Sequence, residues 1–386
     1  MNSMVIDMLT LALPLGNTHG WGICGKNLAR ELARLSPVRL VTKPFDAGDI
    51  GDEFEYLELR RIFADRDAAR APASGGPVFQ AITGAELLPM APEIRGTRNV
   101  GYAFIEQSIL PASSLDNART HFDVVAAGST WCRDVLAGHG LEQTAVVLQG
   151  VDPAIFNMYE NRKAFFGDRF VVFSGGKFEF RKGQDIVIRA FRVLQQRHDD
   201  VLLVNAWFNH WEDSVRTMAA SPHIEFSYHG GDHCSAINGL LSANGIDLER
   251  VVTLPAKSQL AMARIYKNTD CGLFPNRCEG GTNLALMEYM ACGKPAIVSN
   301  SSGHRDIANE GNTLLLKNLQ PLTVAMGGQQ ATAVWDEPSL DEAIEALEWA
   351  YQNREALHDI GEAAGWSMQS FSWAETARQF HALLSE

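Results

Sequence analysis

Two acidic residues in the second half of the chain bracket a glycine turn and a short apolar helix. Glu279 stands directly before residues 280–283 (Gly-Gly-Thr-Asn), and Glu288 follows with eight residues between the two acids. Glycines let a backbone approach a ligand closely, and the free amides at a helix start point toward an anion. A sugar nucleotide needs backbone donors for its diphosphate and acceptors for its hydroxyls. The segment therefore predicts a binding site for such a ligand after a strand.

A second turn carries the opposite charge. Lys177 and Lys182 stand five residues apart, with Arg181 beside the second lysine, between an expected strand at 170–174 and an expected helix at 185–196. When the bond between an anomeric carbon and phosphate breaks, the departing nucleoside diphosphate carries new negative charge, which fixed cations stabilise. A solvated basic turn is the plainer interpretation, but the paired acids of the other turn favour a shared diphosphate site.

A glycine motif near the N-terminus supports a different class of enzyme. Residues 20–25 (Gly-Trp-Gly-Ile-Cys-Gly) fit Gly-x-Gly-x-x-Gly after an expected strand. Asp46 follows about twenty residues later, where an NAD site places the acid that binds the ribose. Because no hydride-transfer site is evident in the rest of the sequence, a NAD-dependent oxidoreductase is kept only as an alternative. A non-catalytic sugar-nucleotide-binding protein is a second alternative.

Three further features could belong to a site or to the scaffold. Glu106 follows an expected strand at 99–104, where it could orient a substrate hydroxyl or cap the residues after it. His304 follows an expected strand at 296–299 and could be a cleft residue, although a surface histidine is the favoured interpretation. The aromatic residues within 207–211 could stack on a sugar, although packing of the second domain is the favoured interpretation.

The pattern of apolar runs predicts the scaffold of these residues. Short apolar runs alternate with helical patterns, which is typical of parallel βαβ units and an α/β fold. A chain of 386 residues suits two domains, and the polar run 157–169 is the expected hinge. Between 46 and 98 the pattern is too weak to trace. The expected strands are 5–13, 38–41, 99–104, 124–127, 145–148, 170–174, 201–206, 251–254, 271–274 and 296–299, and the expected helices include 27–35, 131–137, 185–196 and 373–384.

Composition excludes several classes of protein. The net charge of −13 argues against a nucleic-acid binder, because neutralising phosphates needs a basic face. It weakens attraction to anionic lipid, although a local basic patch would still allow peripheral membrane contact. No run approaches the roughly 20 apolar residues of a membrane span, and the N-terminus has no signal-peptide pattern. We therefore expect a cytoplasmic protein whose oligomeric state the sequence leaves open.

Neither cysteines nor histidines form a metal-binding pattern. The six cysteines show no Cys-x-x-Cys spacing, and the eleven histidines show no His-x-x-x-His pair. We expect reduced, mostly buried cysteines and no metal or other cofactor.

At these motifs the chain resembles a known family. Residues 279–295, ending in Met-Ala-Cys-Gly-Lys-Pro, are similar to the signature of retaining family 4 glycosyltransferases of the GT-B fold. Residues 173–183 resemble the family's Gly-Arg-Leu-x-x-x-Lys-Gly, with Lys177 at the arginine position. Residues 149–156 resemble its Asn-Gly-Val-Asp-x-x-x-Phe. One departure is the spacing of the two acids, which the family separates by seven residues.

The resemblance implies a fold, a reaction and a set of site residues. It implies two Rossmann-like βαβ domains with a cleft between them: an acceptor domain at 1–160, to which a helix at about 370–386 returns, and a nucleotide-sugar donor domain at 165–368. It implies transfer of a hexose from a nucleotide diphosphate sugar to a glycan, lipid-linked or small-molecule acceptor, with retention of configuration and without a metal. The candidate catalytic residues are Lys177, Lys182, Glu279 and Glu106, and the candidate donor-binding residues are Gly20, Gly22, Arg181, Gly280, Gly281, Thr282, Asn283, Leu284 and Glu288.

Overall fold

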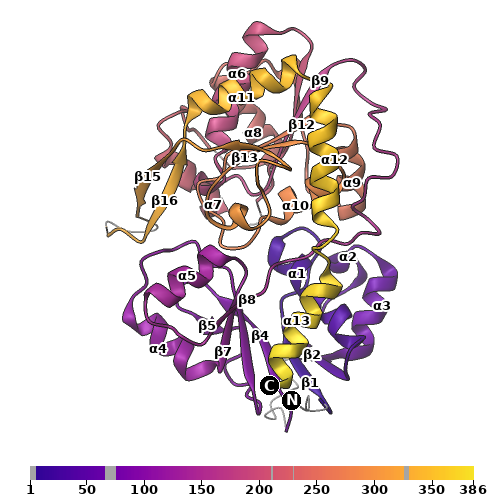
Figure 1. The fold of residues 1–386 in the computed structure, drawn as a ribbon, viewed down its shortest axis with the longest axis vertical. Coiled ribbons are helices and arrows are strands. Elements are labelled where there is room, and N and C mark those ends of the chain that lie inside the picture. The colour runs from indigo at the N-terminus through magenta and orange to yellow at the C-terminus, as the bar shows by residue number, and fades with distance from the viewer. Residues whose placement is uncertain (1–5, 66–74, 210–211, 229, 326–329) are drawn as a thin grey trace. The chain divides into compact units, whose positions relative to one another are not determined.

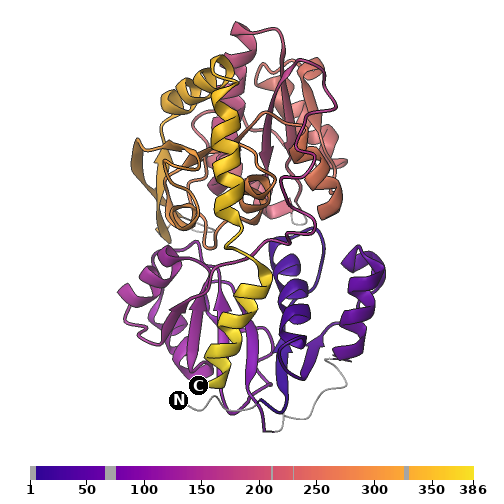
Figure 2. The same ribbon diagram turned by 45° about the vertical axis from the view of Figure 1, so that its right-hand side comes forward.

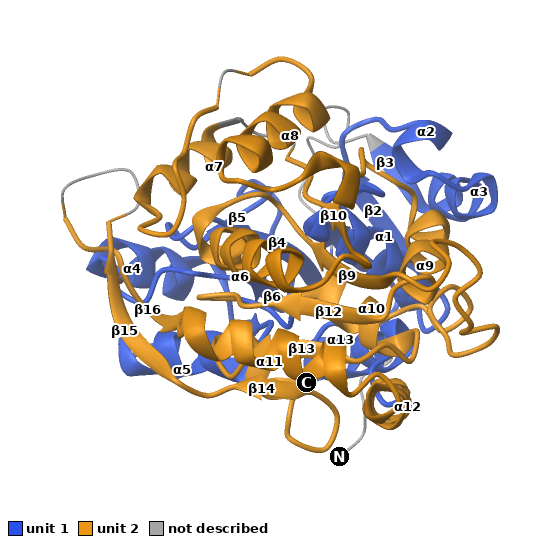
Figure 3. Ribbon diagram, turned by 90° about the horizontal axis from the view of Figure 1, so that it is seen from above, with its two compact units in different colours: residues 1–150, 280–282, 370–386 blue, residues 151–279, 283–369 orange. Residues whose placement is uncertain are grey.

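The computed structural model describes residues 6–65, 75–209, 212–228, 230–325 and 330–386. They form two compact units, coloured separately in Figure 3. Unit 1 comprises Met1–Gly150, Gly280–Thr282 and Ser370–Glu386, and unit 2 comprises Val151–Glu279 and Asn283–Gln369. The chain passes from the first unit to the second at residue 150, before the polar run that the sequence marks as a hinge.

Unit 1 is built on a parallel sheet with one short antiparallel strand. The strand order is β3-β2-β1-β4-β6-β7-β8, and β5 pairs with β4 alone. The chain winds outward from β1 in one direction and from β4 in the other, so a topological switch point lies between them. The strands are β1 (Leu9–Ala12), β2 (Val38–Thr42), β3 (Phe63–Asp65), β4 (Val78–Thr83), β5 (Leu88–Pro89), β6 (Asn99–Ala103), β7 (Val124–Ala127) and β8 (Thr144–Val146).

Helices cover both faces of this sheet (Figure 1). The core between the sheet and α4 and α5 includes Ile82, Phe122 and Leu136, all buried. Because both faces are covered, β1 is buried along its whole length and β4 at all but its last residue. The helices are α1 (Gly20–Ala33), α2 (Ala47–Ile50), α3 (Glu53–Ile62), α4 (Ala112–His121), α5 (Thr130–Gly138) and α13 (Trp373–Ser385).

The C-terminal helix α13 packs against α1 and β6 of unit 1 (Figure 2). Ser372 begins the helix by accepting a hydrogen bond from the Glu375 amide at 3.2 Å. Phe380 is fully buried, with its ring 4.2 Å from the Phe79 ring and 4.7 Å from the Tyr102 ring, centroid to centroid. This aromatic cluster joins the last helix to the central strands of the sheet.

Unit 2 contains a six-stranded parallel sheet with the order β11-β10-β9-β12-β13-β14. Its switch point lies between β9 and β12, which are neighbours in the sheet. The strands are β9 (Phe170–Gly175), β10 (Val201–Ala206), β11 (Val251–Thr253), β12 (Cys271–Phe274), β13 (Ala296–Ser299) and β14 (Leu314–Leu316), and the helices are α6 (Gln184–Arg197), α7 (Glu212–Arg216), α8 (His233–Ala243), α9 (Gln259–Lys267), α10 (Leu284–Ala291), α11 (Leu340–Gln352) and α12 (Ala356–Met368).

A two-stranded antiparallel hairpin, β15 (Leu319–Val324) and β16 (Ala333–Pro338), stands apart from the main sheet of unit 2. Its residue Trp335 is buried, and its ring centroid lies 6.5 Å from that of Phe180. The hairpin therefore packs against the segment that carries Lys182.

The structure confirms most expected elements and corrects some boundaries. The α/β class with two parallel-sheet units is confirmed. The first helix begins at Gly20 and not at residue 27, because the glycine motif forms its first turn. The untraced region 46–98 contains two helices and three strands among its described residues. The hairpin was not expected, since its polar and apolar residues alternate only weakly.

We predict that Phe380→Ala destabilises unit 1 by about 3–5 kcal/mol, because it removes a buried ring and leaves a cavity between α13 and the sheet. Urea unfolding followed by circular dichroism measures the loss. The control is Gln379→Ala, an exposed neighbour on the same helix. A Phe380→Ala variant within about 0.5 kcal/mol of wild type would contradict the packing described here.

Candidate functional site

The two charged turns follow β9 and β12, the neighbouring strands on either side of the switch point of unit 2. Ligands of open parallel sheets bind outside the carboxyl ends of the strands at this place, because the connections leave toward opposite sides. We call residues 176–183 the lysine turn and residues 275–279 the acidic turn. Their position alone makes them the candidate site of this unit.

The lysine turn is fixed by hydrogen bonds to its backbone. Asn209 accepts from the Phe178 amide at 2.7 Å and donates to the Phe178 carbonyl at 3.0 Å. Gln184 donates to the Lys177 carbonyl at 2.6 Å. Gly183 ends the turn at φ +71°, and a Cβ there would stand 2.1 Å from the Pro275 carbonyl oxygen. The lysine turn therefore lies directly against the acidic turn, and only glycine fits at this contact.

Hydrogen bonds to the end of β13 and to the residues after it hold the acidic turn in place. Ser299 and Ser301 donate to the Asn276 carbonyl at 2.6 and 2.9 Å. The Glu279 amide donates to Ser302 Oγ at 2.7 Å. These bonds fix the backbone from which the Glu279 carboxylate projects.

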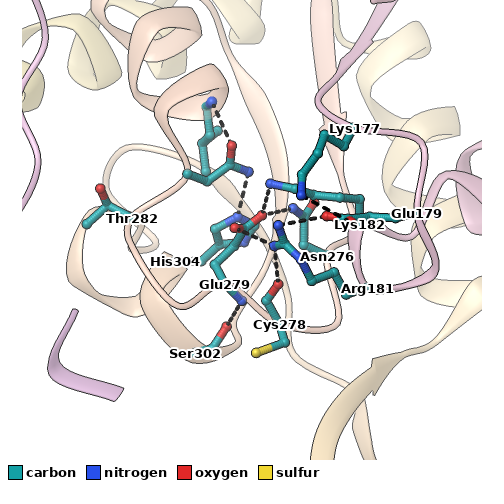
Figure 4. A network of polar contacts seen from close by, with 12 residues as sticks. Lys177, Glu179, Arg181, Lys182, Asn276, Cys278, Glu279, Thr282, Ser302 and His304 are labelled. Atoms are coloured by element: carbon teal, nitrogen blue, oxygen red, sulfur yellow. Dashed lines mark hydrogen bonds and ion pairs between the residues drawn. The ribbon is translucent and has the colours of Figure 1, made fainter. Parts of the chain in front are cut away.

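The two turns meet in a chain of alternating charges, drawn in Figure 4. Lys182 Nζ lies 2.5 Å from Glu279 Oε1, and Arg181 Nη1 lies 2.9 Å from Glu279 Oε2. Arg181 Nη2 lies 2.7 Å from Glu179 Oε1, and Lys177 Nζ lies 3.3 Å from Glu179 Oε2. Asn276 also donates to Glu279 Oε1. The structure thus brings together Lys177, Arg181, Lys182 and Glu279 of the sequence-predicted site.

Burial and charge set the protonation of this cluster. Burial would raise the pKa of Glu279, but the neighbouring Lys182 and Arg181 outweigh it and lower the pKa to about 2. Burial lowers the pKa of Lys182, and the nearby Glu279 carboxylate opposes that shift. Of the three N–H donors of the Lys182 ammonium, one is taken by Glu279 within the described part of the chain. Among the residues that the structure describes, the other two donors bond to no protein group and are open to a ligand.

Glu288 lies on α10 in a separate set of hydrogen bonds. Gln259 Nε2 donates to its Oε1 at 3.0 Å, and the Tyr266 hydroxyl donates to its Oε2 at 3.1 Å. Both donors come from α9, so α9 orients the carboxylate that the resemblance assigns to ribose binding. Glu288 is buried and belongs to the same unit as the charge cluster.

His304 is fully buried, which corrects its interpretation as a surface histidine. Asn283 Nδ2 lies 3.0 Å from His304 Nε2, and the other ring nitrogen lies 3.2 Å from the Ser299 carbonyl oxygen. The neutral ring with its proton on Nδ1 satisfies both contacts. Burial lowers the pKa of His304 to about 4. Asn283 caps α10 at a left-handed φ of 69°, and His304 fixes its amide.

The remaining candidates belong to unit 1. Gly20 and Gly22 form the first turn of α1, where a Cβ on Gly22 would stand 2.7 Å from the Gly16 backbone. Glu106 follows β6, and α4 begins after Pro111. Residues 280–282 group with unit 1, where the Thr282 amide donates to Gln149 Oε1 at 3.4 Å. Leu284 opens α10 in unit 2.

Two alternatives from the sequence receive local structural explanations. Asp46, the candidate ribose acid of an NAD site, forms a capping box with Asp49 at the start of α2. Trp207 is buried and donates to Ser174 Oγ at 3.0 Å, which confirms its packing role. Residues 210 and 211 lie outside the described residues. All six cysteines are free, and five are buried.

Sequence reasoning missed Arg277, which is completely buried beside the cluster. It pairs with Asp185 of α6 and with Glu337 of β16. Although burial alone would lower its pKa, these carboxylates raise it above the ordinary value. An arginine two residues before Glu279 gives a sequence signal only if its acidic partners, far away along the chain, are known.

We predict that wild-type stability falls by about 1.4 kcal/mol per pH unit from His304 alone between pH 6.5 and about 4. In this window the unfolded histidine binds a proton that the folded one does not, so stability rises with pH. Urea unfolding of wild type and His304→Gln across pH 7.5 to 4.5 tests this. The stability advantage of wild type should shrink as the pH falls, and a constant difference would contradict a buried neutral ring.

Comparison with known proteins finds a family match for part of unit 2. Residues 168–327 match the model described as "Glycosyl transferases group 1". This segment includes the lysine turn, the acidic turn, α10 and β13. No curated protein sequence matches the chain.

Solved structures extend the likeness to the whole fold. A sucrose-phosphate synthase from Thermosynechococcus elongatus is 15% identical, with 97% of each chain covered and a TM-score of 0.69. HepE from Anabaena, solved in complex with UDP and glucose, is 15% identical over 97% of this chain and 98% of its own, with a TM-score of 0.64. An α,α-trehalose 6-phosphate synthase from Burkholderia multivorans is 13% identical over 97% of this chain and 95% of its own, with a TM-score of 0.61.

None of the described helices is long and apolar enough to span a membrane. At such low identity the solved structures establish the fold alone, and the family match covers the motifs of unit 2. Residues 168–327 therefore match the glycosyl transferases group 1 family, and the chain has the GT-B fold.

Proposed function

We propose that the chain transfers a hexose from a nucleoside diphosphate sugar to the hydroxyl of a glycan, lipid-linked or small-molecule acceptor. The acceptor oxygen bonds to the anomeric carbon, the bond from that carbon to the phosphate oxygen breaks, and the nucleoside diphosphate leaves with the electron pair. One proton is released overall. The observation that carries this proposal is the buried Lys182 ammonium at the switch point of unit 2, which Glu279 holds and whose other two donors have no partner among the described residues.

The charge cluster supports the departure of a diphosphate. Lys177, Arg181 and Lys182 supply three cations, and Glu179 and Glu279 supply two carboxylates, so the cluster keeps one net positive charge. Fixed cations stabilise the charge that develops on the leaving group without reorganising during the reaction. Among the described residues no group of three or more His, Cys, Asp or Glu could hold a metal ion. We assign charge neutralisation to these side chains, and the resemblance to family 4 enzymes supports a metal-independent reaction.

The roles of the acids complete the proposal. Glu288, oriented by Gln259 and Tyr266, would accept hydrogen bonds from the ribose hydroxyls of the donor. Glu279 would lie beside the donor sugar while holding Lys182. Retention of the anomeric configuration rests on the resemblance to family 4 enzymes. UDP is the first nucleotide to test, because HepE was solved in complex with it.

We predict that one nucleoside diphosphate among UDP, GDP and ADP raises the melting temperature of wild type and that Lys182→Ala weakens its binding about 10- to 100-fold. The estimate follows from the roughly 1.5–3 kcal/mol of one charge-assisted contact. Thermal-shift screening identifies the nucleotide, and titration calorimetry measures its Kd. The control is Lys317→Ala, an exposed lysine of unit 2 that pairs with Glu310.

The same screen tests the alternatives. Stabilisation by NAD and by none of the three nucleoside diphosphates would refute the proposal in favour of an oxidoreductase. Tight binding of a nucleotide sugar without hydrolysis or transfer to any acceptor would identify a non-catalytic binding protein.

We predict that wild type binds the 2′,3′-dideoxy form of its nucleotide about tenfold more weakly than the ribose form, because the Glu288 carboxylate loses its donors. Glu288→Gln should reduce this difference to less than about threefold. Titration calorimetry with both nucleotides checks it. The control is Glu310→Gln, which is exposed, and an unchanged preference in Glu288→Gln would remove this residue from the ribose site.

A further inference from the structure

Arg277 uses every donor it has. Its Nη1 donates to Asp185 Oδ1 at 2.8 Å and to the Phe180 carbonyl at 2.6 Å. Its Nη2 donates to Asp185 Oδ2 and Glu337 Oε1, both at 2.8 Å, and its Nε donates to Glu337 Oε2. Guanidinium has five N–H donors, so this buried group is fully satisfied. A fully paired buried arginine of this kind tolerates only one geometry of its partners.

Two of these partners, Phe180 and Asp185, stand before and after Lys182 along the chain. Phe180 begins the 3₁₀ turn Phe180–Lys182, and Asp185 lies in the first turn of the helix that follows. The Arg277 amide donates to the Arg181 carbonyl at 2.7 Å, and the guanidinium lies 3.9 Å from the centre of the Phe180 ring. Arg277 therefore binds residues on both sides of Lys182 in the chain and holds the backbone that carries it.

The same residue also belongs to the acidic turn. Arg277 precedes Glu279 by two residues in the acidic turn. The Glu279 side chain forms the ion pair with Lys182 of the lysine turn. Arg277 also pairs with Glu337 of β16 in the hairpin, and Trp335 of the same strand packs near Phe180. One guanidinium thus joins the lysine turn, the acidic turn and the hairpin.

We propose that Arg277 is a positioning residue: it sets the separation of Lys182 and Glu279, and through them the affinity of the diphosphate group. The inference rests on the proposed function, in which Lys182 contacts that group. A role in folding alone would change stability without changing nucleotide binding by the folded protein. A positioning role changes both, and its effect on binding passes through Lys182.

Arg277→Lys is the informative variant, because a lysine keeps the charge but cannot fork to two carboxylates and a carbonyl. Arg305→Lys is the matched control. Arg305 is exposed and pairs with Asp336, the neighbour of Glu337 in β16. Leu347→Ala in α11 is the control for lost stability, because it removes a fully buried side chain from a helix outside both turns.

Two measurements at a temperature well below unfolding decide the matter. Hydrogen exchange without ligand should become at least tenfold faster at the amides of Lys182, Gly183 and Arg277 in Arg277→Lys, and not in Leu347→Ala. The Kd for the nucleoside diphosphate that binds wild type should rise at least tenfold in Arg277→Lys and stay within about twofold in both controls.

A double-mutant cycle then tests the route of the effect. In a Lys182→Ala background, Arg277→Lys should weaken binding by less than about twofold, because the contact it positions is already absent. Unchanged exchange, unchanged Kd or fully additive effects would each overturn the proposal. If wild type binds none of the nucleotides, the proposed function fails, and the exchange data still show whether Arg277 orders the lysine turn.

Discussion

The ion pair between Lys182 and Glu279 is the interaction on which the rest of the site depends. Both side chains are nearly buried, with exposed fractions of 10% and 6%. Taking two charges out of water costs more than their attraction returns unless other polar groups complete the geometry. Arg181 and Asn276 supply those groups at Glu279, which explains why its pKa falls despite burial. The pair therefore needs the surrounding turns to be held rigidly.

The topology of unit 2 provides that rigidity. β9 and β12 are neighbours although about a hundred residues separate them, and their carboxyl ends deliver the two turns to one place. The close approach of Gly183 to the Pro275 carbonyl and the forked bonds of Arg277 then fix the turns against each other. A parallel sheet alone would bring the turns near, but it would not set the ammonium and the carboxylate at hydrogen-bonding distance.

These contacts also explain what the sequence could and could not predict. Strands such as 201–206 and 271–274 were predictable, because buried parallel strands consist mostly of apolar residues. Lys182 and Glu279 were identifiable because their motifs combine charge with glycine at short spacing. Arg277 was not, since its partner Asp185 is 92 residues away. His304 was misjudged for a similar reason: its burial depends on Asn283 and Ser299, which meet only after β13 has paired with β12.

A carboxylate inside a site for an anion requires a physical explanation. Without Glu279, the buried Lys182 ammonium of the empty protein would lose its partner and pay the full cost of desolvation. With Glu279, the ammonium is already oriented. Glu179 orients Lys177 in the same way, and Arg181 pairs with both Glu179 and Glu279. The excess of one cation over the carboxylates preserves attraction for a diphosphate. In the proposed function, Glu279 lowers the affinity that Lys182 could reach alone, but it keeps the donors in place before the ligand arrives, which is the condition for electrostatic stabilisation of a leaving group.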